Sequence, residues 1–247
     1  MNLKYYFIFT ILSMSYLSHE VVYASSNNQS AKSIYNKMVS KYSIMKSYHD
    51  LGQATKELRV DGVIKIKEIK HFESYYISPK KYLLEWVSID GITKPKYNAI
   101  LFKDGNGYSW LDNEKVNKSN NIDGLLSSVV GVSDGISYIV PLFLMQSELC
   151  LSSTRIAKIN IVNKGVLSGY NVYILDVTYT SGRKETLWVD SDNYILRKAE
   201  EKRKLSKNKD IIISILYKDI DVNKALKTET FTNKEKEFEE ELSKTGN

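Results

Sequence analysis

Residues 131–135 (GVSDG) match the G-x-S-x-G pattern of the nucleophile elbow found in many hydrolases. In that motif a strand precedes the serine, a helix follows it, and a histidine later in the chain supplies the base. No histidine follows Ser133, and the residues before it have helical periodicity. The pattern therefore indicates a flexible break between two helices, and a hydrolase is the weakest of the three functions that we consider.

Short tripeptide matches also resemble the signature of penicillin-binding proteins. Residues 43–46 and 78–81 fit S-x-x-K, residues 191–193 read SDN, and residues 244–246 read KTG. The KTG follows a glutamate-rich run, and the SDN falls in an expected turn between two strands. Neither position suits a catalytic site, so we interpret these matches as chance.

Metal and thiol chemistry has equally little support. Asp190 and Asp192 resemble the start of a calcium loop, but Tyr194 takes the third ligand position and the required glycine is missing. Cys150 has no ligand spacing with His49 or His71 and no basic surroundings that would activate a thiol. We expect no catalytic residue, no metal and no cofactor. Cys150 is expected to be a small core residue, although no role is assigned to it.

The composition is that of a globular protein: 247 residues, 43% hydrophobic and 26% charged, with 12 Gly and 3 Pro. The net charge of +6 is too small to indicate a nucleic-acid partner, and we expect none. The basic residues between 202 and 209 are interpreted as a solvated hairpin tip. Contact with anionic headgroups is the alternative.

The N-terminal residues have the pattern of a secretory signal. Lys4 precedes a mostly apolar run over residues 5–17, and residues 22–24 (VYA) suit cleavage after Ala24. A membrane anchor is the alternative, but the run is shorter than the roughly 20 residues that a spanning helix needs. The sequence therefore predicts a signal peptide (1–24) and an exported single domain (25–247), which we expect to be a monomer.

Helical and strand patterns follow one another along the rest of the chain. Ile34, Met38 and Tyr42 recur at helical spacing between residues 29 and 46. From residue 48 the apolar positions alternate as in half-buried strands, with a phase slip near Glu68 that indicates a bulge. Short turns such as residues 181–182 indicate hairpins, because parallel crossovers need about a dozen residues or more.

Two helices are predicted in the middle of the chain, over residues 122–130 and 136–144, with Pro141 expected to kink or end a turn. Strands resume afterwards, giving about eleven antiparallel strands in total. Neither strand-rich half has enough helix to cover its own apolar face, so we expect one shared sheet and an α+β fold. The highly charged segment 233–244 predicts a frayed helix or a disordered tail, the tail extending over about 233–247.

Apolar side chains are abundant on the expected strands and on the second central helix. Residues 136–145 are expected to form a lid over the concave side of a curved sheet, leaving a pocket for a lipid-sized ligand; the alternative is that all of these residues are core. Ten buried methylenes would contribute about 8 kcal/mol to binding. The candidate ligand-binding residues are Phe72, Tyr82, Leu84, Trp86, Phe102, Trp110, Ile136, Ile139, Val140 and Phe143.

Three stretches resemble a known family. Residues 78–86 (SPKKYLLEW) are similar to its P-x-x-[YF]-x-x-E strand, residues 131–144 to its central helices, and residues 169–198 to its [LW]-[VI]-D turn with a returning strand. The chain thus resembles the LolA/LolB/RseB-like lipoprotein localisation factors, and within them LolA-like outer-membrane lipoprotein-sorting and DUF2092-type periplasmic proteins. The resemblance implies an unclosed half-barrel with an N-terminal helix. An Arg on an early strand matters in those carriers, but the context of Arg59 does not match it.

The resemblance and the apolar pattern together favour a non-enzymatic periplasmic carrier or chaperone. Its expected ligand is a lipid, an acyl chain or a lipoprotein in a hydrophobic cavity. The alternative is a periplasmic sensor or interaction module of the RseB-like type that binds an exported protein domain. In either case a membrane protein or lipoprotein is a further expected partner.

Overall fold

A computed structural model gives the structure of residues 29–89, 95–112, 116–146 and 155–245. The expected signal peptide (1–24), its cleavage site and Cys150 lie outside these residues and stay predictions.

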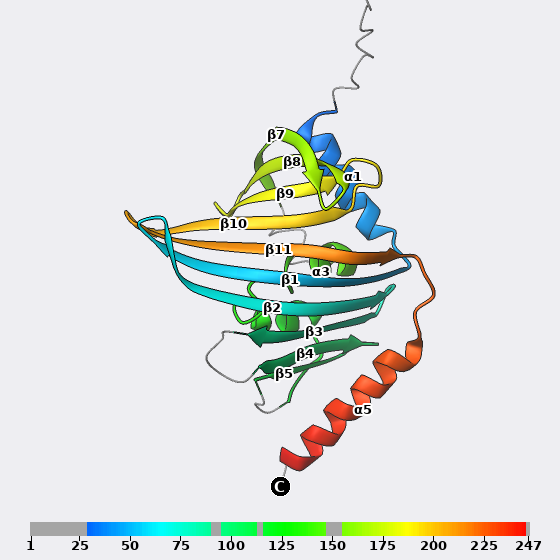
Figure 1. Cartoon of the computed structure of the whole chain (residues 1–247). Coiled ribbons are helices and arrows are strands. Elements are labelled where there is room, and N and C mark those ends of the chain that lie inside the picture. The colour runs from blue at the N-terminus through cyan, green and yellow to red at the C-terminus, as the bar shows by residue number, and fades with distance from the viewer. Residues whose placement is uncertain (1–28, 90–94, 113–115, 147–154, 246–247) are drawn as a thin grey trace, which may run out of the picture.

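Eleven antiparallel strands form one curved, unclosed sheet in the order β6-β5-β4-β3-β2-β1-β11-β10-β9-β8-β7 (Figure 1). The predicted strand number, antiparallel pairing and shared sheet are confirmed. The strands are β1 (Ser47–Val60), β2 (Val63–Ile77), β3 (Lys81–Ile89), β4 (Lys96–Lys103), β5 (Asn106–Leu111), β6 (Asn117–Ser119), β7 (Ile156–Leu167), β8 (Tyr170–Tyr179), β9 (Lys184–Asp190), β10 (Leu196–Ser206) and β11 (Lys209–Val222).

The first and last strands join two sequential meanders. β1 and β11 pair from Tyr48 opposite Val222 to Val60 opposite Lys209, so β1–β6 continue the sheet on one side and β10–β7 on the other. The bulge expected near Glu68 lies earlier. Leu58 pairs with Ile66 whereas Arg59 pairs with Ile64, which leaves Lys65 as the extra residue.

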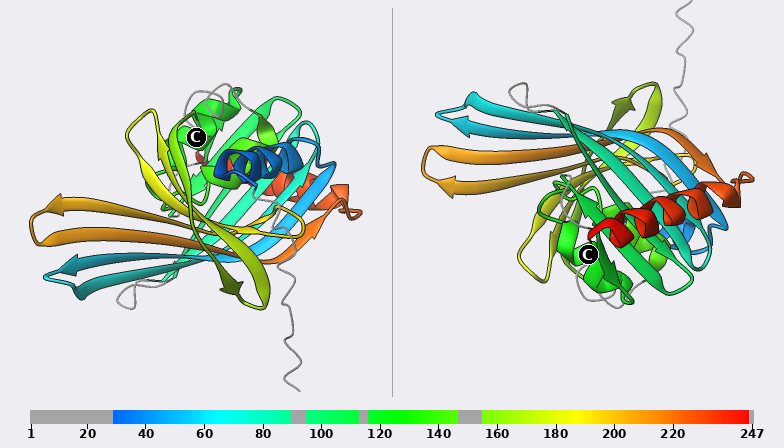
Figure 2. Two further views of the ribbon diagram at one scale, coloured as in Figure 1. Left: turned by 90° about the horizontal axis from the view of Figure 1, so that it is seen from above. Right: turned by 90° about the horizontal axis from the view of Figure 1, so that it is seen from below.

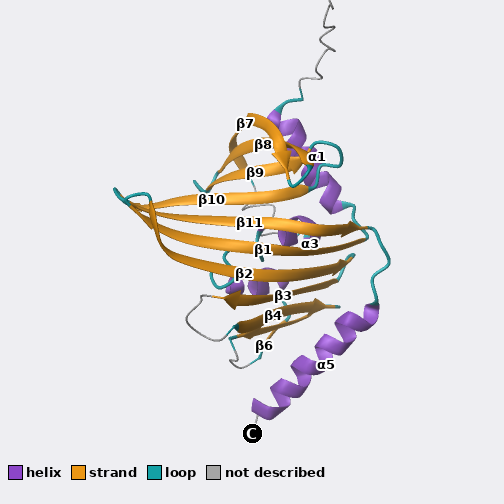
Figure 3. Ribbon diagram, viewed as in Figure 1, coloured by secondary structure: helices purple, strands orange, loops and turns teal. Residues whose placement is uncertain are grey.

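Three helices pack on the concave face of the sheet, where their buried aliphatic and aromatic side chains belong to the main core cluster. They are α1 (Ala31–Ser43), α2 (Ile122–Val129) and α3 (Ile139–Met145); α1 and α3 are labelled in Figure 3. Ser30 caps α1 by accepting a hydrogen bond from the Ser33 backbone N–H at 3.2 Å. We call residues 122–146, which comprise α2, α3 and the turns between them, the lid; its place over the concave face agrees with the prediction.

Pro141 does not end α3, which continues to Met145, and residues 136–138, expected to be helical, precede the helix as turns. Pro141 is the third residue of α3. Backbone N–H groups in the first turn of a helix have no carbonyl partner within the helix, so a proline there removes no hydrogen bond.

The charged segment 233–244 belongs to helix α5 (Thr228–Thr245), which lies on the convex face of the sheet, and is not a disordered tail (Figure 2). Phe231 and Phe238 are fully buried against a second core cluster, and Leu242 packs on the same cluster. Phe238 stacks on Tyr108 at 5.6 Å between ring centroids. These apolar residues share one helix face, a pattern that the surrounding charges concealed in the sequence.

Replacing Phe238 with alanine should lower the free energy of unfolding by about 3–5 kcal/mol, because a fully buried ring is lost from its contacts with Tyr108 and Trp110. Urea denaturation measures the change. Lys236→Ala, at an exposed position of the same helix, is the control and should change stability by less than about 0.5 kcal/mol. Equal stability of the two variants would contradict the docking of α5.

Candidate functional site

Nine of the ten predicted ligand-binding residues lie on the concave side of the sheet. Eight belong to the main core cluster, and Phe102 packs against it. Trp110 instead packs against the convex-side cluster beneath α5, with its ring 6.3 Å from that of Phe238. Alternation placed Trp110 correctly on a strand, but it could not tell which of the two apolar faces is the concave one.

The interior beneath α3 is filled by the protein's own side chains. The eight core residues are at most 5% exposed. Phe143 of α3 packs edge-on against Tyr35 of α1 at 6.2 Å, and Phe72 packs against Tyr217 at 5.8 Å. Among the ten predicted residues, Ile139 alone lines the cavity described next. Ligand contact by the other nine stays a prediction.

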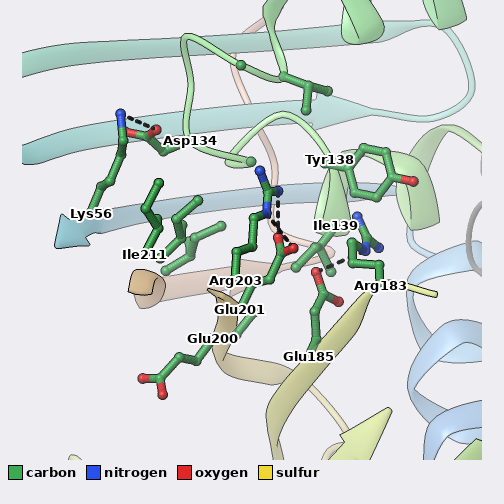
Figure 4. Close-up of a pocket in the computed structure, with 16 residues that line it drawn as sticks. Lys56, Asp134, Tyr138, Ile139, Arg183, Glu185, Glu200, Glu201, Arg203 and Ile211 are labelled. Atoms are coloured by element: carbon green, nitrogen blue, oxygen red, sulfur yellow. Dashed lines mark hydrogen bonds and ion pairs between the residues drawn. The ribbon is translucent and has the colours of Figure 1, made fainter. Parts of the chain in front are cut away.

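A cavity of about 200 Å³ lies between the turns of the lid and strands β10 and β11 (Figure 4). Its floor is apolar and consists of Ala199, Ile211, Ile213 and Ile215. Its roof belongs to the lid and consists of Val130, Gly131, Asp134, Gly135, Tyr138 and Ile139. Charged residues of β1, β9 and β10, together with Arg183 in the turn before β9, complete the wall, so an apolar surface is bordered by polar groups.

Asp134 fastens the lid to the sheet. Its carboxylate is almost fully buried and forms an ion pair with Lys70 of β2 and a second, at 3.6 Å, with Lys56 of β1. Burial lowers the pKa of Lys56, but Asp134 and Glu68 outweigh that effect, and the pKa is raised above its ordinary value. Lys56 is therefore charged at neutral pH, and the turn that roofs the cavity is tied to two neighbouring strands.

The opposite wall contains two further ion pairs. Arg203 donates from Nε and Nη2 to the carboxylate of Glu201, at 2.6 and 2.7 Å. Arg183 Nε lies 3.5 Å from Glu185, and its guanidinium lies 4.1 Å from the ring centroid of Tyr138 on the lid. Burial raises the pKa of Glu185. Because each cation faces a carboxylate, the wall is polar without a large excess of either charge.

The apolar floor continues outward beyond the lid. Leu58 of β1 pairs with both Ile66 of β2 and Ile211 of β11, so these three side chains lie in one row on the same face of the sheet. Leu58 and Ile211 are half-buried, and Ile66 is 52% exposed. We call these three residues the outer floor; it extends the surface from the cavity toward the ends of the long hairpins.

A polar centre is buried deeper in the concave core. Asp50 is fully buried and accepts hydrogen bonds from the hydroxyls of Tyr48, at 2.8 Å, and Ser74. Burial raises its pKa to about 6. Nearby, the Tyr217 hydroxyl is buried without a hydrogen-bond partner among the described residues. Sequence reasoning missed Asp50, although an acidic residue in phase with inward-facing Tyr48 was a usable signal.

Sequence reasoning also missed the cavity, and here no usable signal existed. Ile211, Ile213 and Ile215 were recognisable as one strand face, but nothing local showed that the lid leaves part of this face uncovered. Lys70 and Asp134 are 64 residues apart, so their pairing has no signature in sequence spacing.

The structure contains no catalytic elbow at Ser133. This residue follows helix α2 rather than a strand, and its side chain is fully buried. Its Oγ lies 3.0 Å from the Oγ of Ser137 and donates to the Val130 carbonyl at 3.3 Å. Residues 191–193 lie in the turn between β9 and β10, as the sequence predicted. Both motifs therefore have structural roles.

Two further properties concern the described part of the chain. None of its clusters of His, Cys, Asp or Glu reaches the three members that could hold a metal ion. None of the helices within these residues is long and apolar enough to cross a membrane.

No protein-family model matches the chain, and no curated protein matches it. Solved structures do match at low identity. LprF from Mycobacterium bovis is 9% identical, with 80% of this chain and 94% of that chain covered and a TM-score of 0.47. MucB is 12% identical, with coverage of 81% and 62% and a TM-score of 0.44. A LolA superfamily protein from Nitrosomonas europaea is 12% identical, with coverage of 82% and 97% and a TM-score of 0.36.

One of these matched structures is thus a protein of the LolA superfamily, the group that the sequence resembles. Because the quoted TM-scores are below 0.5 and the identities are low, this likeness assigns no ligand, partner or activity to the chain.

The raised pKa of Asp50 predicts the direction in which the stability of the fold changes with pH. The folded state favours the protonated acid. As pH rises from about 4 through 6, ionisation of Asp50 therefore lowers the free energy of unfolding, and the lost stability is regained as pH falls. Asp50→Asn cannot ionise. Relative to wild type it should therefore gain about 1 kcal/mol in free energy of unfolding between pH 5 and pH 7.

Urea denaturation at the two pH values measures this difference, and groups common to both proteins cancel. Asp219→Asn, at an exposed position on β11, is the matched control and should parallel wild type. An Asp50→Asn protein whose stability also runs parallel to wild type would show that Asp50 has no raised pKa.

Proposed function

We propose that the chain is a non-enzymatic binding protein that carries or chaperones a lipid, an acyl chain or a lipoprotein through its acyl chains. The observation that supports this proposal is an apolar floor that the lid covers only in part. Ile213 and Ile215 are buried beneath the lid, and the outer floor continues the same face into solvent. A hydrocarbon chain laid on this face would remove it from water.

The dimensions suit part of a long chain rather than a whole compact molecule. The cavity of about 200 Å³ is smaller than the roughly 300–1,000 Å³ of typical small-molecule pockets. A ligand that reaches from the cavity along Ile211 to Leu58 and Ile66 would use both the covered and the open parts of the floor. An extended acyl chain has this shape.

The polar wall supports a carrier rather than an enzyme. Lys56, Arg203 and Arg183 each face a carboxylate, so they border the apolar floor as paired groups. Ser133, the best sequence candidate for a nucleophile, points into a buried contact with Ser137. An amphiphile could place its chain on the floor and its polar end at this wall.

A protein-interaction module is the second candidate, and the sheet edge formed by β7 favours it. β7 is an end strand of the sheet, and Val162 and Val166 on it are 58% and 72% exposed. Exposed edge strands can pair with a strand of another protein. Crosslinking to an exported protein domain, with a floor that binds no fatty acid, would favour this function over the first.

Ligand binding on the floor is tested with a fluorescent fatty acid, 11-(dansylamino)undecanoic acid. Wild-type protein should bind it saturably. Ile211→Glu should weaken the binding tenfold or more, because the new carboxylate would lose water on contact with the chain. Fluorescence titration measures both affinities.

Ile212→Glu is the matched control, since Ile212 is the adjacent residue on the opposite face of β11 and pairs with Glu57 and Lys202. It should change the affinity less than threefold. Absence of saturable binding by wild type, or equal losses in the two variants, would refute binding on the concave floor.

A further inference from the structure

Two long hairpins project together from the body of the sheet (Figures 1 and 2). One joins β1 to β2 and the other joins β10 to β11. Their ends are held side by side, because Val60 pairs with Lys209 and the Asp61 N–H donates to the Asn208 carbonyl at 2.8 Å. We call residues 59–67 and 202–210 the tip surface.

Aliphatic side chains are exposed on this tip surface. Val63 is 56% exposed, Ile64 45%, Ile66 52% and Leu205 55%. Single exposed apolar residues are common on proteins, but these four are concentrated at two adjoining hairpin ends. Burial in the core does not account for them, and a turn requires no such side chains.

Positive charge is concentrated at the same place. Residues 59–67 hold three basic residues and one acidic residue, and residues 202–210 hold five and one, a net charge of +6 that equals that of the whole chain. Arg59 and Lys67 face Glu57, Lys202 faces Asp210, and Arg203 faces Glu201. The remaining four lysines form no ion pair with any described residue: Lys65, Lys204, Lys207 and Lys209.

From this combination we propose that the tip surface docks on an anionic lipid bilayer. Lysines near a membrane are attracted to anionic headgroups, and exposed aliphatic side chains can enter the interface beside them. An acidic protein would also attract the lysines. The bilayer is favoured because the aliphatic residues stand at the projecting ends, where they can enter a fluid interface without a shaped partner surface.

The docking surface goes beyond the proposed function, and its position next to the outer floor connects the two. The outer floor (Leu58, Ile66 and Ile211) joins the cavity to the tip surface on the same strands, since Ile211 also lines the cavity and Ile66 also belongs to the tip surface. A molecule docked by its tips would therefore place the open end of its apolar floor toward the lipid. Ligand could then pass between bilayer and protein along a continuous apolar path.

Co-sedimentation with vesicles tests the proposal on the full chain. Vesicles of phosphatidylcholine alone are compared with vesicles of phosphatidylcholine and phosphatidylglycerol in a 7:3 ratio. The tip variant carries Lys65→Glu, Lys204→Glu, Lys207→Glu and Lys209→Glu. It should bind the anionic vesicles at least tenfold more weakly than wild type, and added salt should weaken wild-type binding.

The control variant carries the same change in net charge at four exposed lysines elsewhere: Lys32→Glu, Lys46→Glu, Lys80→Glu and Lys236→Glu. It should keep most of the affinity for anionic vesicles. Both variants share the apolar segment 5–17, so any contribution of that segment to vesicle binding cancels between them. A third variant, Val63→Ser with Ile64→Ser and Leu205→Ser, should also bind at least threefold more weakly while retaining every charge and every residue of the outer floor.

Equal binding by the tip and control variants would overturn the proposal, whether both retain affinity or both lose it. So would wild-type binding that does not depend on anionic lipid, or tips that crosslink only to an acidic protein. Titration with the dansylated fatty acid distinguishes a failure of the docking proposal from a failure of the proposed carrier function. The tip variant should bind that probe like wild type, so loss of vesicle binding alone concerns docking, and loss of probe binding in wild type concerns the carrier.

Discussion

The backbone ladder between β1 and β11 is the interaction on which the rest of the structure depends. Its paired residues lie between 149 and 174 positions apart in sequence, and the pairing turns two meanders into one sheet. Without it each meander would expose an unpaired edge and an apolar face that its own helices are too few to cover. Because β1 and β11 are also 14 residues long each, the ladder reaches past the lid and supports both the outer floor and the tip surface.

The two faces of this sheet are covered in different ways. On the convex face α5 seals a compact cluster around Phe231 and Phe238, with Lys234 of α5 2.8 Å from Glu85 of β3. On the concave face α1 and the lid cover the centre of the sheet but not the outer end of β11. The cavity lies beneath the turns of the lid, and the outer floor continues the same face beyond them, so the candidate site exists because the lid is shorter than the strands beneath it.

A buried ion pair in the concave core positions the lid, although burying its two charges costs solvation free energy. Removing Asp134 and Lys70 from water is unfavourable, and their mutual attraction offsets that loss only while both stay in place. The pair therefore selects one position for the turn that roofs the cavity. Among the described residues, no cation forms a hydrogen bond with Asp50. The hydroxyls of Tyr48 and Ser74 donate to its carboxylate, and burial outweighs these hydrogen bonds and raises its pKa to about 6.

The sequence by itself determined the elements: period-two alternation marked strands such as Tyr82–Trp86 and Ile211–Tyr217, helical spacing marked α1, and the misplaced Ser133 and KTG motifs argued against catalysis. These are local properties, set by which side of a strand or helix each residue occupies. Tertiary structure alone decided which apolar face is concave, and so separated Trp110 from Trp86. It also decided that the charged segment after residue 228 docks as a helix, that Asp134 meets Lys70, and that the cavity lies over Ile211 rather than beneath Phe143. Those outcomes depend on contacts between distant segments, and both faces of this sheet carry enough apolar residues for alternation to be ambiguous between them.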